Sequence, residues 1–400
     1  MSKWQLIVTV PKRGFRRVQR EITAIRSQAP LRAAHRSGRR IVAFHVPSSF
    51  MFTFSAPIWK ELMKKHQRDI FSCFIVEKGH STDPVAHLLS VGVPRECIIP
   101  VQNPSEVNLC DLFLTPTFAS GKPRSSRLTV QLFHGLAGWG MTKWASEQQH
   151  DIFRPFTDLF ITGPMLQNTL TSNAVLTLEP TIQFHSVGYP KTDSLFDGVF
   201  SKHNICKDLG LDSSKPLILY APTWEKEASL HTDGISIIRT LAKEDVNILV
   251  KLHPNSYFAK GECEYQGVRW LREMEALERR HPNLRNIRAF NSNPYLVASD
   301  LLITDVSGIG FEFLLLNKPI IYWRCPKFEN THGLSDLQTE AYGVGRTVET
   351  PEKLQRAIFT ELDPSSQNTQ ARKKFAETLV YNPGTASAAA AREIHKLLFS

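Results

Sequence analysis

Residues Leu301–Phe313 read LLITDVSGIGFEF, and this stretch determines which fold class the chain adopts. Its first four residues are apolar or β-branched, which predicts a short strand over 301–304 that is buried on both faces. A helical pattern follows over 310–316, after a turn that contains Ser307 and Gly308. A buried strand that leads into a helix is the repeating unit of parallel α/β sheets, so the stretch predicts an α/β protein.

The same pattern recurs along most of the chain. Strands are predicted at 41–46, 70–76, 97–101, 112–118, 128–133, 159–162, 182–187, 217–221, 248–252, 301–304, 320–323 and 344–348. Helices are predicted at 57–67, 84–91, 235–243, 268–280, 310–316, 353–361 and 386–398. Short apolar strands separated by helices are typical of doubly wound parallel sheets, so we expect two Rossmann-like domains.

Length and turn residues indicate how the chain is divided. A chain of 400 residues and 45.3 kDa is longer than one compact domain usually is. Turn-forming residues concentrate at 197–216, which places the boundary near residue 205. We expect residues 1–40 to be an N-terminal segment of the first domain. The rest of that domain is expected over 41–204, and the second domain over 205–400.

Composition excludes several protein classes. Hydrophobic residues make up 42% of the chain and charged residues 22%, as in folded soluble proteins, which argues against disorder. No stretch approaches the roughly 18 consecutive apolar residues of a membrane-spanning helix, and residues 1–5 do not resemble a signal peptide. The six cysteines lack the spacing of a zinc site or a disulfide framework, so we expect reduced thiols.

Positive charge is concentrated at the N-terminus. Residues 1–40 hold eleven of the 48 Lys and Arg residues but one of the 38 acidic residues, so they carry the whole net charge of +10. Leu6–Val10 predicts a first strand, and Phe15–Ile25 predicts a basic amphipathic helix. The helix could lie on an anionic membrane, bind nucleic acid, or be solvated. Because the other 360 residues have no charge surplus, nucleic acid is the weakest of these interpretations.

Basic and titratable residues follow two of the predicted strands. His134 comes after the strand at 128–133 and precedes Gly135, where flexible backbone allows a substrate to approach closely. Lys251 and His253 come at the end of the strand predicted at 248–252. They lie on the same side of it, because alternate residues of a strand share a side. A cation and a titratable base at one strand end are typical of a site that binds an anionic phosphate and transfers a proton. A histidine held in a turn and a lysine packed along its stem are the structural alternatives.

Polar residues also follow two other predicted strands. Asp305 follows the strand at 301–304, and Ser307 can cap the next helix, whose N–H groups suit a phosphate. Ordinary capping without a ligand is the alternative. Thr223 follows the strand at 217–221. The chain lacks the Walker loop, the G-x-G-x-x-G loop, the G-x-S-x-G elbow and the H-E-x-x-H pair, which argues against the enzymes that carry them.

Taken in order, five motifs resemble the CDP-glycerol glycerophosphotransferase family, whose members assemble teichoic acids and related capsule polymers. The motifs are Phe133-His134-Gly135, Gly188-Tyr189-Pro190-Lys191-Thr192-Asp193, Leu219-Tyr220-Ala221-Pro222-Thr223-Trp224, Lys251-Leu252-His253-Pro254 and Thr304-Asp305-Val306-Ser307-Gly308. The resemblance implies a glycosyltransferase-B-like fold, a CDP-alditol held mainly by the C-terminal domain, and an acceptor site in the N-terminal half.

The resemblance also implies a reaction. Such an enzyme moves glycerol phosphate, or a related alditol phosphate, from a CDP-alditol to a hydroxyl of a cell-surface glycan or lipid-linked acceptor and releases CMP. His134 and His253 are then the catalytic residues, with His134 as general base. The residues expected to bind the donor are Lys251, Thr223, Ser307, Gly308, Asp305 and Glu312, and those expected on the acceptor or interdomain side are Gly135 and Asp193.

Two departures from the family pattern leave details open. The usual His-Gly-Thr-Pro reads His134-Gly135-Leu136-Ala137, and the usual Asp-Tyr-Ser-Ser reads Asp305-Val306-Ser307-Gly308. The donor alditol and the acceptor are therefore undecided. No metal site or cofactor is expected, although Mg²⁺ can accompany a diphosphate.

The expected partners are CDP-glycerol or another CDP-alditol, a glycan or polyprenyl-diphosphate-linked acceptor, and an anionic membrane surface, but no nucleic acid. The expected location is cytoplasmic, peripheral on the inner face of the cell membrane. Two other interpretations stay open. One is a glycosyltransferase-B nucleotide-sugar transferase or UDP-sugar epimerase, which shares these strand ends, and the other is a non-catalytic protein that binds membranes or polyanions.

Overall fold

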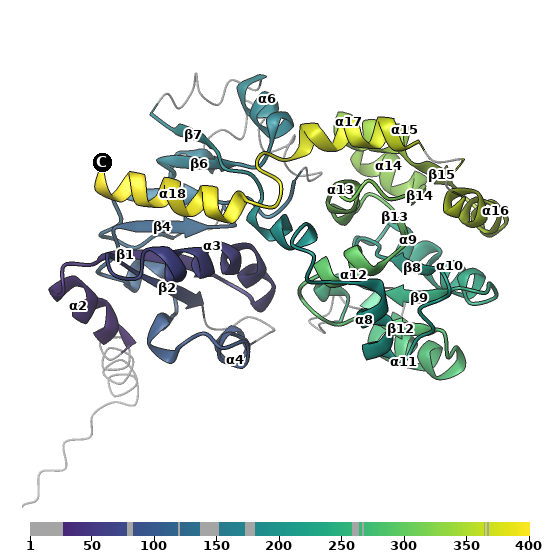
Figure 1. The fold of residues 1–400 in the computed structure, drawn as a ribbon, viewed down its shortest axis with the longest axis horizontal. Coiled ribbons are helices and arrows are strands. Elements are labelled where there is room, and N and C mark those ends of the chain that lie inside the picture. The colour runs from purple at the N-terminus through teal and green to yellow at the C-terminus, as the bar shows by residue number, and fades with distance from the viewer. Residues whose placement is uncertain are drawn as a thin grey trace, which may run out of the picture. The chain divides into compact units, whose positions relative to one another are not determined.

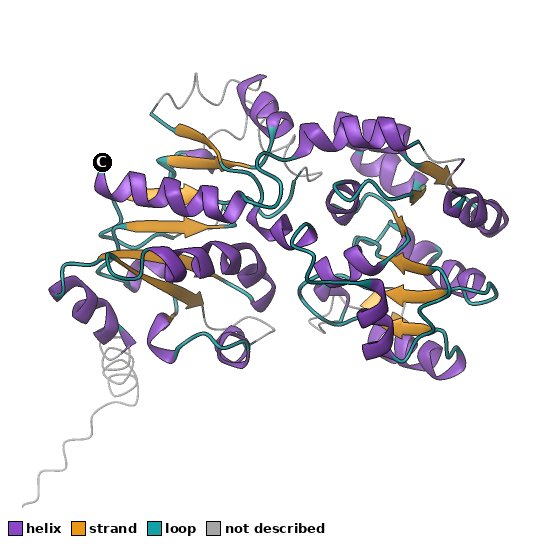
Figure 2. Cartoon of the chain, viewed as in Figure 1, coloured by secondary structure: helices purple, strands orange, loops and turns teal. Residues whose placement is uncertain are grey.

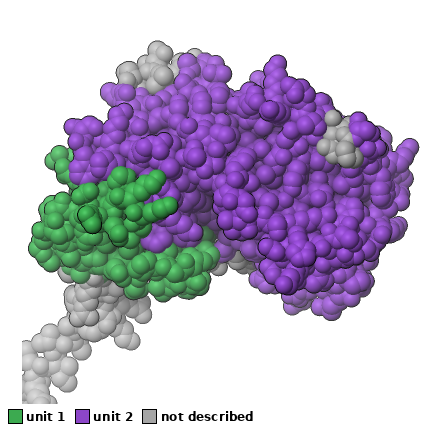
Figure 3. All heavy atoms as spheres, viewed as in Figure 1, with its two compact units in different colours: residues 1–49, 62–115, 119–129 green, residues 50–61, 116–118, 130–400 purple. Residues whose placement is uncertain are grey.

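The computed structural model describes residues 27–77, 83–118, 121–136, 152–172, 181–257, 264–265, 268–363, 365 and 368–400. The chain forms two compact units, coloured separately in Figure 3. Unit 1 comprises residues 1–49, 62–115 and 119–129, and unit 2 comprises residues 50–61, 116–118 and 130–400. The strand predicted at Leu6–Val10 and the basic helix predicted at Phe15–Ile25 lie outside the described residues.

Unit 1 contains parallel strands in the order β3-β2-β1-β4. These are β1 (Arg40–Val46), β2 (Ile70–Glu77), β3 (Ile98–Val101) and β4 (Leu112–Thr115), with helices α2 (Ala29–Arg36) and α4 (Pro84–Ser90). Residues 41–46 of β1 are all buried, as a run that is apolar except for His45 predicts. Cys73, Cys97 and Cys110 are buried free thiols.

Unit 2 contains parallel strands of two sheets (Figure 1). In the first, β5 (Leu128–Gln131), β6 (Asp158–Ile161) and β7 (Gln183–Ser186) pair in that order. The second has the order β12-β9-β8-β13-β14-β15, and every pair in it is parallel. Its strands are β8 (Leu217–Tyr220), β9 (Asn247–Val250), β12 (Leu284–Asn286), β13 (Leu301–Thr304), β14 (Ile320–Trp323) and β15 (Arg346–Val348).

Helices lie on both sides of the second sheet (Figure 2). Those of unit 2 are α6 (Pro164–Ser172), α8 (Lys202–Leu209), α9 (Ser229–Thr232), α10 (Gly234–Leu241), α11 (Trp270–Arg280), α12 (Asn293–Ala298), α13 (Ile309–Leu314), α14 (Pro326–His332), α15 (Asp336–Val344), α16 (Pro351–Leu362), α17 (Thr369–Leu379) and α18 (Ala386–Phe399). Two elements, α3 (Phe52–Lys65) and β5, have residues in both units. The short 3-10 helices η5 (Pro190–Leu195) and η6 (Pro254–Ser256) follow β7 and β9.

The burial of β13 confirms the fold class predicted from residues 301–313. Leu301 and Ile303 belong to one hydrophobic cluster, and Leu302 belongs to another. Alternate residues of a strand point to opposite faces, so both faces of this sheet are covered by apolar side chains.

Several element boundaries differ from the prediction for local reasons. Strand β4 ends at Thr115, before Pro116, because proline has no N–H group for the sheet. Residues Val268–Arg269 form a short strand, so the helix predicted over 268–280 begins at Trp270. Strand β12 was not predicted, because Arg285 and Asn286 interrupt its apolar pattern.

The last helix returns to the first sheet of unit 2. His185 on β7 lies between Asp158 Oδ1 at 2.7 Å and Glu393 Oε1 of α18 at 2.9 Å. The domain boundary predicted at residue 205 falls within α8, which separates β7 from β8. The domain limits therefore stay a prediction.

Candidate active site

A pocket of about 220 Å³ in unit 2 brings most of the predicted site residues together. Its lining includes His134, Gly135, Thr223, Lys251, His253, Ser307, Gly308 and Glu312. These residues follow β5, β8, β9 and β13, whose carboxyl ends are where ligands bind in open parallel sheets. Of the predicted residues, Asp193 and Asp305 do not line the pocket.

His134 is held in one tautomer by a backbone carbonyl. The backbone of Phe133 has a φ of 53°, so the chain turns sharply between β5 and the histidine. His134 Nδ1 lies 2.5 Å from Pro116 O. Because a carbonyl only accepts hydrogen bonds, Nδ1 carries the proton of the neutral ring and Nε2 carries the lone pair. Burial lowers the pKa of His134 from 6.5, and the carbonyl partly opposes that shift.

His253 is held in the opposite tautomer. Its Nδ1 accepts the backbone N–H of Asn255 at 3.2 Å, so Nε2 carries the proton of the neutral ring. The ring stacks on Trp224, with ring centroids 6.0 Å apart. It also makes an edge-to-face contact with Phe50, with ring centroids 5.5 Å apart. Burial, and then the charges of Lys251 and His134, lower the pKa of His253 to about 3. The ring is therefore a neutral hydrogen-bond donor through Nε2.

Lys251 is buried, with 7% of the residue's surface exposed. Its Nζ donates to Ala289 O at 2.8 Å. Burial, together with the charge of Lys191, lowers the pKa of Lys251 to about 8, and Glu312 partly opposes that shift. Such an amine favours an anionic ligand, which would restore the stability of its charged form.

Lys191 and Glu312 form a buried ion pair in the pocket lining. Lys191 Nζ lies 2.5 Å from both carboxylate oxygens of Glu312 and 3.2 Å from Ser292 Oγ. The Lys191 ammonium also lies 5.8 Å from the centre of the Phe54 ring. Glu312 was predicted to contact the donor, and the structure places it against this lysine.

Asp305 organises two loops behind the pocket. It is 1% exposed and accepts the N–H groups of Thr223, Ser229 and Ser307 at 2.9, 3.2 and 3.1 Å. The hydroxyl of Ser229 donates to it as well, at 2.6 Å. Burial raises the pKa of Asp305, and these four hydrogen bonds oppose the shift. Asp305 therefore fixes the loops that carry Thr223 and Ser307 to the pocket.

The capping role predicted for Ser307 is wrong. Helix α13 begins at Ile309 with Gly308 as its N-cap, and no side chain caps it. The reason is that Ser307 lies in the turn closed by Asp305, one residue before the capping position.

Asp193 lies away from the pocket. Its carboxylate accepts the N–H groups of Ala386 and Ser387 at 2.9 and 2.7 Å, at the start of α18. Burial raises the pKa of Asp193, and these bonds oppose the shift. Gly188, in the same motif, has a φ of 97°, and a Cβ there would collide with the carbonyl of Tyr381. This motif therefore joins the chain after β7 to the C-terminal segment.

Sequence reasoning missed several lining residues. Lys191 belongs to the motif at 188–193, two residues before Asp193. Nothing in the sequence indicated that this lysine, and not Asp193, would line the pocket. Trp224 closes another quoted motif. Phe50 and Phe54 belong to no motif. They line the pocket through ring contacts with His253 and His134, which are distant in the sequence, so no local pattern could indicate them.

Within the described ranges, no helix has the length and apolar character needed to span a bilayer. Over the same residues, no group of three or more His, Cys, Asp or Glu side chains is arranged to hold a metal ion.

Sequence comparison identifies relatives that act in teichoic acid synthesis. The chain is 24% identical to a teichoic acid poly(ribitol-phosphate) polymerase of Bacillus spizizenii over 286 residues, which are 66% of this chain and 42% of that protein. It is 30% identical to a teichoic acid glycerol-phosphate primase of Bacillus subtilis over 148 residues, 35% of this chain and 33% of that protein. The chain thus spans less than half the length of these relatives.

Solved structures share the fold at low sequence identity. The wall teichoic acid polymerase TagF matches with a TM-score of 0.63 and 17% identity, covering 96% of this chain and 97% of that one. A UDP-GlcNAc 2-epimerase from Neisseria meningitidis matches with a TM-score of 0.56 and 15% identity, covering 90% of this chain and 100% of that one. These likenesses, with the two parallel sheets, confirm the predicted glycosyltransferase-B-like fold.

Residues 180–396, more than half of the chain, match the sequence pattern of the CDP-Glycerol:Poly(glycerophosphate) glycerophosphotransferases. The matched region covers four of the five motifs on which the resemblance rests, and it includes Lys251, His253 and the turn at 305–308. The chain therefore belongs to the CDP-glycerol:poly(glycerophosphate) glycerophosphotransferase family.

Proposed function

We propose that the protein transfers glycerol phosphate, or a related alditol phosphate, from a CDP-alditol to an acceptor hydroxyl and releases CMP. One observation carries the proposal: two partly buried histidines line one pocket in opposite tautomers, beside two lysines. One ring offers a lone pair and the other an N–H group. That combination fits a reaction that removes a proton from a nucleophile and stabilises negative charge on phosphate.

His134 is the proposed general base. Its Nε2 accepts the proton of the acceptor hydroxyl while the hydroxyl oxygen forms a bond to the β-phosphorus. The bond between that phosphorus and the bridging oxygen breaks, and CMP leaves with the electron pair. Because burial lowers the pKa of His134, the ring is unprotonated at neutral pH and ready to accept the proton.

The donor phosphates are proposed to lie against Lys251 and His253. The Lys251 ammonium and the His253 Nε2–H group donate to phosphate oxygens, with the Ser307 hydroxyl and the backbone at Gly308 nearby. The Ser307 N–H is already bound to Asp305, so it is not available to the ligand. Positioning and charge neutralisation dominate phosphoryl transfer, and both are tasks of these groups.

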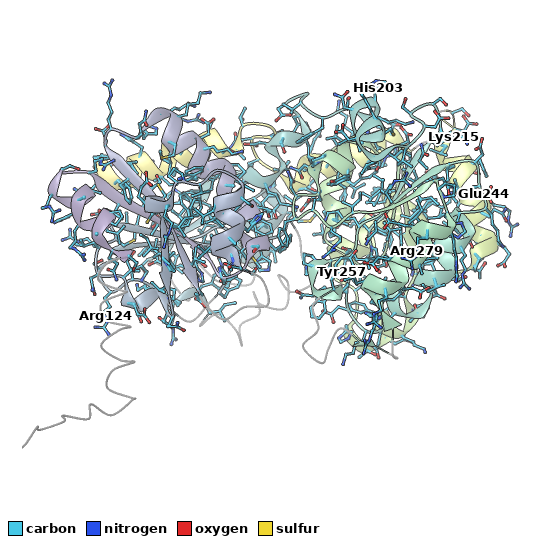
Figure 4. The ribbon with its side chains drawn as sticks, turned by 90° about the horizontal axis from the view of Figure 1, so that it is seen from below. Arg124, His203, Lys215, Glu244, Tyr257 and Arg279 are labelled. Carbon is cyan, nitrogen blue, oxygen red and sulfur yellow. The ribbon has the colours of Figure 1, made fainter. Side chains whose placement is uncertain are left out.

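The proposal is tested by CMP release from CDP-glycerol and CDP-ribitol with a lipid-linked saccharide as acceptor. His134→Ala should lower turnover by roughly 10²- to 10⁴-fold, the usual contribution of a general base. His203→Ala is the matched control, since His203 is an exposed histidine on α8 (Figure 4). Turnover close to wild type in His134→Ala would remove the assignment.

The acceptor is proposed to be a glycan or a polyprenyl-diphosphate-linked saccharide at the inner face of the cell membrane. The eleven basic residues of 1–40 support this proposal, because each contributes roughly 1 kcal/mol of attraction to an anionic bilayer. Cosedimentation with anionic liposomes should weaken as salt rises, because ions screen this attraction. Association that salt does not change would oppose an electrostatic anchor.

A second candidate follows from the likeness to UDP-GlcNAc 2-epimerases. An enzyme of that kind on this fold would bind a uridine nucleotide in the same pocket. Preference for UDP over CDP would favour it.

A further inference from the structure

The charges of the pocket are unevenly paired. Its lining includes two lysines, Lys191 and Lys251, and one carboxylate, Glu312. Both oxygens of Glu312 lie 2.5 Å from Lys191 Nζ, so this carboxylate is committed to Lys191. Within the part of the chain that the structure describes, Lys251 Nζ donates to the Ala289 carbonyl at 2.8 Å and forms no ion pair with a carboxylate. Among the described residues, one buried amine therefore has a carboxylate partner and the other has none.

The remaining titratable groups that face Lys251 do not compensate its charge. His253, two residues further along the chain, and His134, at the end of β5, have pKa values that burial lowers. Lys191 on η5 repels the Lys251 ammonium, and Glu312 on α13, which is paired with Lys191, attracts it by a smaller amount. Among the described residues that line the pocket, Lys251 is therefore a buried amine without a carboxylate partner.

We propose that Lys251, beside the Lys191–Glu312 ion pair, takes up a proton when a nucleoside diphosphate binds at alkaline pH. The ligand class rests on the proposed function. In molecules whose Lys251 amine is neutral, which are the majority above pH 8, solvent supplies one proton to the amine, and the resulting ammonium donates to a diphosphate oxygen. The ligand keeps its own charge.

The physical reason is linkage between protonation and binding. Burial holds the pKa of Lys251 at about 8 in the empty pocket. A diphosphate oxygen beside the amine stabilises the ammonium and raises that pKa. The ammonium form therefore binds the anion better than the neutral amine does. Affinity is full below about pH 7 and falls as the pH rises through the pKa of the empty pocket.

Titration calorimetry at pH 8.5 tests the proposal with CDP as the probe. Two buffers of different ionisation enthalpy, neither of them a phosphate, report the protons exchanged. At this pH the phosphates of free CDP and both histidines are unprotonated. Wild-type protein should take up about three quarters of a proton per CDP, and its affinity should fall about eightfold between pH 8.5 and 9.5.

Two variants and one control identify the group. Lys251→Arg is permanently charged, so CDP should bind without proton uptake and with an affinity that does not change over this pH range. Lys251→Met covers the case in which arginine does not fit, and it should bind CDP weakly and without proton uptake. Lys215→Arg is the matched control at a surface lysine, labelled in Figure 4, that pairs with Asp245, and it should keep the wild-type uptake.

The same titrations with UDP separate this proposal from the proposed function. Lys251-dependent uptake with UDP, and no binding of CDP, would overturn the CDP-alditol assignment and support the role of Lys251. Binding of CDP without uptake, or uptake that persists in both Lys251 variants, would overturn the role of Lys251 alone. Failure of both nucleotides to bind would overturn both proposals.

Discussion

The carboxylate of Asp193 accepts the backbone N–H groups of Ala386 and Ser387 at 2.9 and 2.7 Å. Helix α18 has no side-chain cap of its own, so this aspartate, almost 200 residues earlier, satisfies its first N–H groups. The motif at 188–193 thus holds the last helix beside β7. One residue of that motif, Lys191, reaches the pocket, and Asp193 supports the fold.

Replacing Asp193 should affect stability and not nucleotide binding. Asp193→Ala removes a helix cap, so we expect a loss of about 1–2 kcal/mol in the free energy of unfolding. Urea denaturation measures the loss, and calorimetry with CDP measures affinity, which should match wild type. Lost CDP affinity at unchanged stability would instead put Asp193 in the binding site.

The Lys191–Glu312 pair should show the energetics of a buried ion pair. Lys191→Met or Glu312→Leu alone leaves an unpaired buried charge and should cost about 3–5 kcal/mol. The double variant removes both charges and should recover most of that loss, as measured by urea denaturation. If the two single losses simply add in the double variant, the pair does not act as a unit.

Activity should have two pH limits with different causes. A base must be unprotonated, and burial lowers the pKa of His134, so the acidic limb of kcat/KM should lie below pH 6.5. The alkaline limb should lie near pH 8, where Lys251 loses its proton in the empty pocket. CMP release at low CDP-glycerol concentration measures both limbs. Lys251→Arg should remove the alkaline limb, and an acidic midpoint above pH 7 would contradict the role of His134.

Asp305 should act through the loops that it holds. Asp305→Ala removes the acceptor of four hydrogen bonds, so the Thr223 and Ser307 loops lose their anchor. We expect a stability loss of at least about 3 kcal/mol, since several buried donors lose their partner. KM for the donor should also rise. Unchanged KM in a folded variant would show that these loops do not carry donor-binding groups.

The pocket residues that could be predicted from the sequence are those that follow strands. His134 and Lys251 come directly after an apolar run, His253 follows Lys251 by two residues, and parallel sheets gather such positions at one edge. The sheets themselves were predictable for the same reason, because continuous apolar runs such as 301–304 require burial on both faces.

The rest depended on contacts that sequence does not reveal. Asp193 looks like a site residue in its motif, and only its distance to Ala386 shows that it caps a helix. Phe50 reaches His253 through the tertiary fold, with no local pattern to indicate it. The tautomers of the two histidines depend on the Pro116 carbonyl and the Asn255 N–H group, neither of which a motif identifies.

Thermal unfolding with a panel of nucleotides tests most directly whether this pocket holds a CDP-alditol. A ligand that binds only the native state stabilises it by about 2.7 kcal/mol at one hundred times its Kd. CMP, CDP and CDP-glycerol should raise the unfolding midpoint of the wild type, and Lys251→Met should reduce the effect of CDP. UDP, UDP-N-acetylglucosamine and GDP should raise the midpoint less. Stronger stabilisation by a uridine or guanosine nucleotide would contradict the proposed donor.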